Sequence, residues 1–444
     1  MPLGARRLKK CILAVLVVFC SAVSFVACSS KKSTAPKQSG LPERVLASQG
    51  VTNVANFGGM VIINGENDTL PRIAPMSAGT NPGLMAVSPT RNIAAAFDSS
   101  TNTVYAVDTT TETSIGRVQL PGPTYSFVIP TANPTGFAAV PTATVNGFAY
   151  LGAIASMNFT NGTFTAIAVN SAQTVVSNSD GSQLLVFSAD SDSVTVLNPG
   201  AATPPVDTSC YYNPPSGACT IVPGFDRPVF AVVNNNTAYI LNCGAQCGGT
   251  QASVMFFDLA TLTVTKTIPV PAATMALLNN TTLYVAGTPR TNNACTGQTT
   301  AATTCGRLTV IDVSSGKVTA SAVITDGYHT RMDLTANTEL FIGSHDCTNI
   351  GNVNDIQTVN NPTSEVRGCL TIYRGDGSLL FPPDNGNVDG LQGFTTRNVE
   401  YVAEGGNLRV YDTTKDILLI NDFLPEGTIN IVGYVGDVKA IDFF

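Results

Sequence analysis

The chain has little charge, only two histidines and no tryptophan. Asp, Glu, Lys and Arg make up 12% of its 444 residues. This shortage of long charged helix formers argues against a helical protein. Two histidines, His329 and His345, are too few for a histidine-rich metal site. The GxSxG, P-loop and HExxH motifs are also absent, which excludes the enzyme classes that depend on them.

The few charges are unevenly distributed along the chain. The formal net charge is −7, although residues 1–27 carry four basic side chains and no acidic one. The remainder is therefore more acidic than the whole, and it contains no basic stripe. Because an acidic surface repels a phosphate backbone, we expect no nucleic acid among the partners.

The first 40 residues have the layout of an export signal followed by a tether. A basic segment at residues 6–10 precedes an apolar run at residues 11–19, and the segment ends in Phe-Val-Ala-Cys at 25–28. This ending resembles the lipobox of bacterial lipoproteins, in which the cysteine is diacylated and becomes the new N-terminus. The resemblance implies a signal peptide at 1–27, lipidation of Cys28 and a flexible tether within 28–40. The alternatives are an uncleaved anchor, for which the apolar run is short, or an ordinary signal peptide with a chance cysteine.

From about residue 44 the sequence repeats. The clearest unit is a short strand ending in Asp or Asn, a polar turn, and a second strand ending near Pro, as at residues 104–121 and 254–271. Two further strands precede most pairs, and the units recur every 40 to 60 residues, the spacing of propeller blades. We count eight units, of which residues 124–169 are the weakest. The expected fold is all-β: one β-propeller of seven or eight four-stranded blades over residues 41–444.

These units resemble YVTN-type repeats of the lactonase-like β-propeller superfamily. The resemblance depends on residues 283–286 (Leu-Tyr-Val-Ala), 401–403 (Tyr-Val-Ala) and 310–318, and it covers nearly all of 44–444. It specifies a fold and hardly an activity. The missing tryptophan excludes the WD dipeptide, the tryptophan docking motif of quinoprotein dehydrogenases and the sialidase Asp-box.

The two ends of the repeat region complement each other. The first unit begins mid-blade at residues 44–47 and lacks an inner strand, whereas residues 429–432 and 438–443 supply spare strand material after the last unit. We therefore expect a C-terminal strand to close the ring, which would remove exposed sheet edges.

An acidic or amide residue recurs at the end of one strand in each clear unit. A ring of carboxylates could bind a metal ion, but a side chain at a strand end can also accept the backbone N–H groups of the following turn. We favour the turn role and expect no metal site. The residues are Asp108, Asp258, Asp312, Asp412, Asn64 and Asn198.

Eight cysteines follow Cys28, in close sequence pairs. An even count in an exported chain favours disulfides between nearest neighbours. Zinc ligation is the alternative, but no paired CxxC spacing is present. The expected pairs are Cys210–Cys219, Cys243–Cys247, Cys295–Cys305 and Cys347–Cys369.

Three insertions are expected to share one face of the disc. If strands A to D run outward from the axis, residues 242–252, 288–306 and 344–368 connect B to C in consecutive units, beside the D–A crossing at 326–329. Long loops on a rigid scaffold commonly carry function, and disulfides would preorganise them; variable decoration is the alternative. The candidate binding residues on this face are Arg290, Tyr328, His329, Arg331, His345 and Arg367.

The leading functional hypothesis is a non-catalytic binding or scaffold propeller at the cell envelope. Its partner would be a protein or glycan that the sequence does not identify, and it would contact the membrane only through its lipid, in the outer membrane if the cell is Gram-negative. We expect no cofactor and no catalytic residue. The alternative is a lactonase-like hydrolase acting at the central channel, which would need converging carboxylates at the axis.

Overall fold

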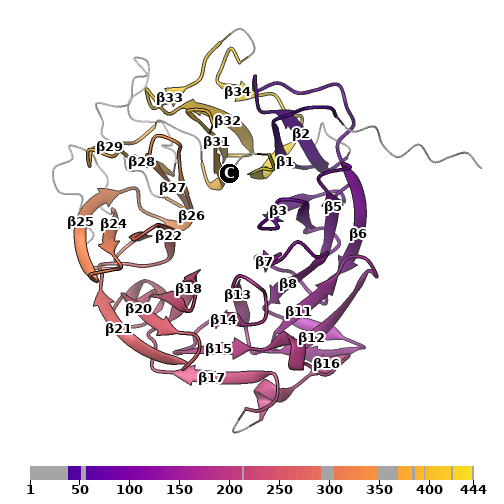
Figure 1. Cartoon of the computed structure of the whole chain (residues 1–444), viewed down its shortest axis with the longest axis vertical. Coiled ribbons are helices and arrows are strands. Elements are labelled where there is room, and N and C mark those ends of the chain that lie inside the picture. Colours follow the sequence, from indigo (N-terminus) through magenta and orange to yellow (C-terminus); the bar gives the residue numbers. More distant parts are fainter. Residues whose placement is uncertain are drawn as a thin grey trace, which may run out of the picture. The chain divides into compact units, whose positions relative to one another are not determined.

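The computed structural model describes residues 39–51, 57–212, 215–291, 305–347, 369–382, 386–394, 396–421 and 424–442. In these ranges the chain forms β-strands and three short 3-10 helices. Eight small sheets surround a central axis, so the protein is an eight-bladed β-propeller (Figure 1). The expectation of an all-β propeller is confirmed, with eight blades and not seven. No helix in the described ranges is long and apolar enough to cross a membrane.

Six blades, numbered here in chain order, have simple strand orders. From the axis outward, blade 2 contains β3 (Pro82–Val87), β4 (Ile93–Asp98), β5 (Thr103–Asp108) and β6 (Thr113–Gln119). Blade 4 contains β13 (Ala172–Ser177), β14 (Leu184–Ser188), β15 (Ser193–Leu197) and β17 (Cys219–Pro223). Blade 5 contains β18 (Pro228–Asn234), β19 (Thr237–Asn242), β20 (Ser253–Asp258) and β21 (Thr263–Pro269). Blade 6 contains β22 (Met275–Asn279), β23 (Thr282–Gly287), β24 (Gly306–Asp312) and β25 (Lys317–Ile324). Blade 7 contains β26 (Tyr328–Leu334), β27 (Leu340–His345), β28 (Leu370–Tyr373) and β29 (Leu379–Leu380). Blade 8 contains β30 (Val388–Gly393), β31 (Val399–Glu404), β32 (Asn407–Asp412) and β33 (Ile417–Leu418), and β34 (Thr428–Ile429) also pairs with β32.

Blade 3, the weakest unit in the sequence, is complete but interrupted. Its strands are β7 (Ser126–Val128), β8 (Thr135–Val140), β11 (Ala153–Asn158) and β12 (Thr163–Ala168), and the hairpin β9 (Ala143–Val145)–β10 (Phe148–Tyr150) is inserted between β8 and β11. A two-residue strand, β16 (Val206–Asp207), adds parallel to β12. The insertion breaks the regular spacing, which explains the weak repeat signal.

The middle strands of the blades are buried on both faces because each blade packs against the next. Every residue of β4 is buried, whereas β21 exposes all but Ile268. Apolar clusters accordingly lie between blades; one joins Phe187 of β14 with Ile240 of β19. Such double-sided burial explains continuous apolar runs such as Ile-Ala-Ala-Ala-Phe at 93–97, which lack strand alternation.

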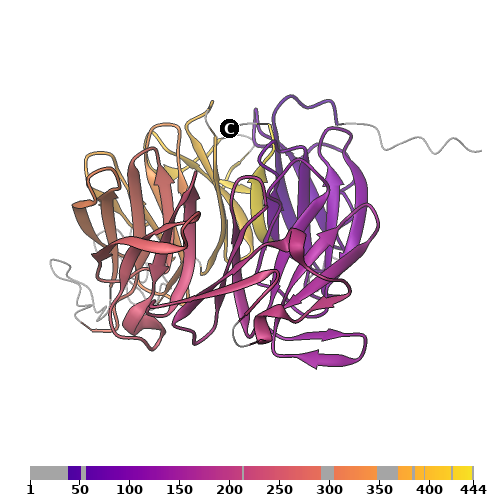
Figure 2. The same cartoon turned by 60° about the horizontal axis from the view of Figure 1, so that its bottom comes forward.

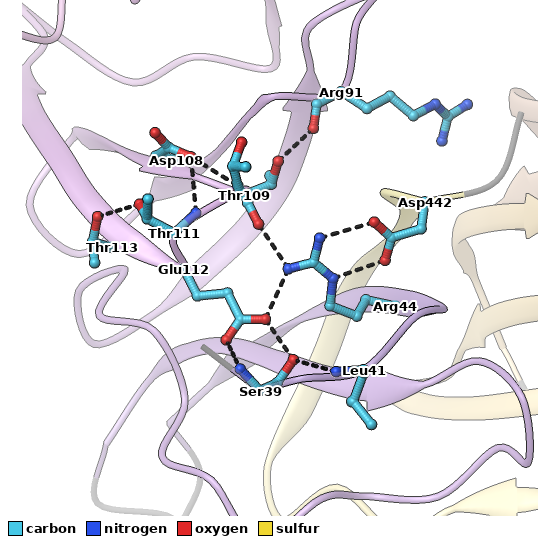
Figure 3. Close-up of polar contacts among 11 residues, drawn as sticks. Ser39, Leu41, Arg44, Arg91, Asp108, Thr109, Thr111, Glu112, Thr113 and Asp442 are labelled. Carbon is cyan, nitrogen blue, oxygen red and sulfur yellow. Dashed lines mark hydrogen bonds and ion pairs between the residues drawn. The ribbon is translucent and has the colours of Figure 1, made fainter. Parts of the chain in front are cut away.

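Blade 1 closes the ring with strands from both ends of the repeat region. β1 (Arg44–Gly50) pairs with β2 (Gly59–Asn64) on one side and with β35 (Tyr434–Ala440) on the other. The predicted closure is confirmed, but its boundaries shift: the closing strand begins at Tyr434, and Ile429 belongs to blade 8. A polar network secures the junction, in which Arg44 binds Asp442, Glu112 and the Thr109 carbonyl (Figure 3).

The recurrent strand-end carboxylates serve turns, as expected. Asp108 Oδ1 accepts the N–H groups of Thr110 and Thr111 at 2.7 and 3.1 Å (Figure 3). Asp258, Asp312 and Asp412 accept turn N–H groups in the same way. In the described ranges no group of three or more His, Cys, Asp or Glu side chains converges as a metal site.

The disc has two distinct faces. The strands of each blade are lettered A to D from the axis outward. We call the closure face the one with the A–B and C–D connections, on which Ser39, Arg44 and Asp442 lie. We call the insertion face the one with the B–C and D–A connections, which include the β9–β10 hairpin. Figure 2 shows the hairpin at the opposite end of the propeller from the C-terminal end. Because Ser39 binds Glu112 through both its backbone N–H and its hydroxyl, the chain enters the propeller on the closure face.

Candidate functional site

A cavity of about 830 Å³ runs along the axis of the propeller. All eight innermost strands or their leading residues line it, since each blade presents one strand to the axis. This volume falls in the range of small-ligand pockets. Its apolar lining consists mainly of Leu84, Met85, Phe127, Val175, Phe230, Met275, Met332 and Leu391.

Aromatic and polar residues gather where the cavity opens on the insertion face. Tyr125 and Tyr328, which start or precede inner strands of blades 3 and 7, are 72% and 42% exposed. Gln173 and Arg227 line the same region from blades 4 and 5. The site therefore has an apolar interior and a rim that can donate hydrogen bonds.

One charged pair in the cavity wall is internally compensated. Lys439 Nζ lies 2.7 Å from Asp437 Oδ1, and Asp437 is fully buried. Asp437 Oδ2 accepts the Met85 N–H at 2.8 Å, which links the closing strand β35 to the inner strand of blade 2. Both carboxylate oxygens are engaged, so this pair serves ring closure.

Arg227 has only distant carboxylate neighbours at the rim. Its Nη1 is 3.9 Å from Asp190 and its Nε is 3.7 Å from Asp192. These carboxylates are 90% and 66% exposed, and solvated pairs at such distances contribute little. Arg227 therefore keeps most of its positive charge available to the rim.

Arg331 of β26 binds backbone carbonyls and no carboxylate. Its Nε donates to the Asp389 carbonyl at 2.6 Å and its Nη1 to the Thr330 carbonyl at 3.0 Å. The Asp389 carboxylate instead lies 3.1 Å from His345 Nε2 and accepts the Tyr434 hydroxyl at 2.6 Å. Burial and this carboxylate raise the pKa of Tyr434 above its ordinary value. Among the described residues, no carboxylate lies within ion-pair distance of Arg331.

The structure brings three of the predicted face residues together. Tyr328 pairs with His345 in the β26–β27 ladder, and Arg331 lies three residues farther along β26. Asp389 and Tyr434 join them from blades 8 and 1, and neither was predicted. The packing of blade 8 on blade 7 places Asp389 beside β26, and ring closure brings Tyr434 there, so no local sequence signal could have identified them.

His329 is a correction to the predicted face. Its side chain is fully buried, Nε2 lies 3.0 Å from the Thr325 carbonyl, and burial lowers the pKa of His329 to about 4. Tyr328 and His329 are neighbours on one strand and therefore point to opposite sides. His329 is thus a packing residue, whereas Tyr328 is exposed.

The remaining predicted residues divide between the surface and the undescribed ranges. Arg290 follows β23 and is exposed, but it does not line the cavity. Arg367, Cys295 and Cys28 lie outside the described residues.

Three of the four predicted disulfides are present among the described residues. Cys210–Cys219, Cys243–Cys247 and Cys347–Cys369 have Cα separations of 5.2, 5.6 and 5.6 Å. The fourth pair includes Cys295 and so is not fully within the described ranges.

The disulfide at Cys243–Cys247 brings an insertion to the rim of the cavity. It encloses the 3-10 helix η3 (Gly244–Cys247), and Cys247 lines the cavity. Within η3, Gln246 Oε1 accepts the Thr288 N–H at 2.9 Å, and the Thr288 hydroxyl donates to the Gly327 carbonyl at 2.8 Å. Connections of blades 5, 6 and 7 therefore meet at the mouth, as the strand order predicts.

Comparison with known proteins identifies the fold and no closer relationship. No protein-family model and no curated protein matches the chain. The dihydro-heme d1 dehydrogenase NirN in complex with DHE is similar, with a TM-score of 0.56 and 12% identity over 90% of this chain and 75% of that chain. The Dos1 propeller has a TM-score of 0.52 and 10% identity over 80% of this chain and 86% of that chain. Kuenenia stuttgartiensis hydrazine synthase has a TM-score of 0.51 and 15% identity over 75% of this chain and 95% of that chain. At these identities the likeness shows the β-propeller fold alone.

Proposed function

We propose that this protein is an exported, lipid-anchored binding propeller of the cell envelope that holds a ligand in its axial cavity without transforming it. The observation that carries the proposal is the cavity of about 830 Å³, apolar inside and rimmed by Tyr125, Tyr328 and disulfide-supported connections. A rigid, preorganised rim reduces the entropy cost of binding. The blades would be of the YVTN type that the sequence resembles.

The proposed address is supported by the N-terminal sequence and by the disulfides. The lipobox-like ending at Cys28 implies acylation, and three disulfides in one domain are typical of an oxidising compartment. Detergent phase partitioning of the wild type and Cys28→Ser tests the anchor. We expect the wild type in the detergent phase and the processed variant in the aqueous phase; a processed variant that stays in the detergent phase would refute lipidation.

A neutral fluorescent probe, N-phenyl-1-naphthylamine, tests binding in the cavity. Gln173 lines the cavity, so Gln173→Trp should obstruct it, and Gln173→Ala is the matched variant that leaves it open. We expect one saturable site per chain, weakened at least tenfold by Gln173→Trp and retained in Gln173→Ala. Absence of saturable binding, or equal binding by the two variants, would refute the cavity as the binding site.

The hydrolase alternative has one observation in its favour, the His345–Asp389 contact near the mouth. A carboxylate that orients an imidazole is an arrangement used in general base catalysis. Assaying δ-gluconolactone hydrolysis with and without a divalent metal ion separates the two functions. We expect no rate above background; hydrolysis that His345→Gln abolishes would establish the alternative.

A further inference from the structure

The inner strand of blade 7 offers hydrogen-bond donors that the protein leaves unused. A guanidinium has five N–H donors, and Arg331 uses Nε and Nη1 on two carbonyls, while its Nη2 makes no hydrogen bond with any described residue. The buried Thr330 hydroxyl also has no partner in the described part of the chain. Both residues line the cavity, as does the partly exposed Tyr328.

Matching acceptors are scarce in the same cavity. Of the lining residues, only Asp190 and Asp437 carry a carboxylate. Both oxygens of Asp437 are engaged by Lys439, Met85 and Val438, and Asp190 is an exposed rim residue beside Arg227. The Asp389 carboxylate near Arg331 is occupied by His345 and Tyr434. Arg331 therefore has no ion-pair partner among the described residues, and its Nη2 keeps free hydrogen-bonding capacity at the cavity wall. This positive group stands out because the chain as a whole has a net charge of −7.

Apolar side chains form much of the cavity wall that these donors share. Met332 follows Arg331 on the same strand, and Leu391, Met275 and Phe230 line the cavity from blades 8, 6 and 5. A guanidinium beside apolar walls binds an anion more strongly than it does in bulk water, because the local dielectric constant is lower. At Arg331 the pocket thus combines a position for an anionic group with space for an apolar body, whereas Arg227 lies at the rim.

From this arrangement we infer that the ligand of the cavity is a monoanionic amphiphile, a molecule with one carboxylate-like group and an apolar body, whose anionic group binds Arg331. The inference rests on the proposed binding function and names the ligand class. Arg331 selects the anion through Nη2, with the Thr330 hydroxyl as a neighbouring donor. The body of the ligand packs against the apolar inner strands.

Two probes that differ by a single anionic group test this inference on the lipid-free full propeller. 8-Anilinonaphthalene-1-sulfonate is N-phenyl-1-naphthylamine with an added sulfonate. We expect the sulfonate probe to bind at least tenfold more tightly at low salt, the gain of one charge-assisted hydrogen bond, and the difference to shrink as salt is added. Sodium dodecanoate should displace the sulfonate probe at concentrations where dodecanol and dodecyltrimethylammonium do not.

Substitutions of Arg331 separate ligand selection from a structural role. Arg331→Met and Arg331→Gln should abolish the preference for the sulfonate probe while keeping the affinity for the neutral probe and a cooperative melt. Arg117→Met, on the exposed outer strand β6, is the matched control and should retain the preference. If the neutral probe binds but the sulfonate probe has no advantage, or if the advantage survives both Arg331 variants, the inference is wrong and the binding function stands. If neither probe binds, the proposed function itself fails.

Discussion

Arg44 and Asp442 are 398 residues apart in the sequence and form a two-point ion pair. Arg44 Nε donates to Asp442 Oδ2 at 2.7 Å, and Nη2 donates to Oδ1 at 2.8 Å (Figure 3). Arg44 Nη1 also donates to Glu112 of blade 2 at 2.8 Å. One largely buried guanidinium thus joins both ends of the propeller to the adjacent blade, so ring closure depends on a residue at the start of its first strand.

Removing one partner of this junction should destabilise the whole ring. Asp442→Ala leaves Arg44 buried beside Glu112 alone, so we expect the free energy of unfolding to fall by roughly 3 kcal/mol, as for other broken buried pairs. Urea unfolding measures the change, and Arg72→Ala, at an exposed position, is the control. A double variant with Arg44→Ala should cost less than the sum of the single variants. Additive effects would mean that the pair does not act as a unit.

The disulfides should differ in how much each adds to the free energy of unfolding, according to the length of chain that each one closes. Cys347 and Cys369 are separated by 22 residues, whereas Cys243 and Cys247 are separated by 4. Loop-closure entropy predicts a loss of about 3 kcal/mol for the Cys347→Ser/Cys369→Ser pair and a smaller loss for Cys243→Ser/Cys247→Ser. Urea midpoints under non-reducing conditions test the order. A larger loss for the shorter loop would contradict the entropic account.

Acidification should destabilise the protein through His329. Because burial lowers the pKa of His329 to about 4, the unfolded chain, with a pKa near 6.5, binds the proton first. Stability is therefore intact above pH 6.5 and is lost as the pH falls toward 4, by on the order of 3 kcal/mol. In His329→Gln, whose amide can still donate to the Thr325 carbonyl, this acid limb should disappear from the pH dependence of urea unfolding. His345→Gln retains His329, so this variant should keep the loss of stability at acid pH. A loss of stability at acid pH that persists in His329→Gln would contradict the role of His329.

Glu339 should make the protein less stable as the pH rises, the opposite of the effect of His329. Burial and the neighbouring Asp416 raise the pKa of Glu339 to about 8 from its ordinary value of 4.5. The folded state then binds more protons than the unfolded state between these values, so this contribution to stability is present below pH 4.5 and is lost as the pH rises to 8. Glu339→Gln should reduce the fall in melting temperature between pH 5 and 8, whereas Glu426→Gln, at an exposed position, should not. An unchanged slope in Glu339→Gln would refute this role.

The strand-end turns and the short disulfides show what could be predicted locally. Asp258 and Asp312 lie next to the turns whose N–H groups they accept, and Cys243 lies near Cys247 along the chain. In both cases the partners are close in sequence, so the pattern alone identifies them. Asp389 of blade 8 gave no such signal, because its partners His345 and Tyr434 come from blades 7 and 1.

The sequence by itself determined the class of fold, the repeated unit, the turns, the three disulfide pairs within the described residues and the strand exchange that closes the ring. Each depends on periodicity or on residues that are neighbours along the chain. The tertiary structure decided the number of blades and which residues surround the axis. It decided also that Tyr328 is exposed while His329 is buried, and that the Asp389 carboxylate binds His345 and Tyr434 rather than Arg331. These outcomes depend on how eight blades pack in a closed ring, because only that packing fixes which side of each inner strand meets the cavity and which charges remain without a counterion.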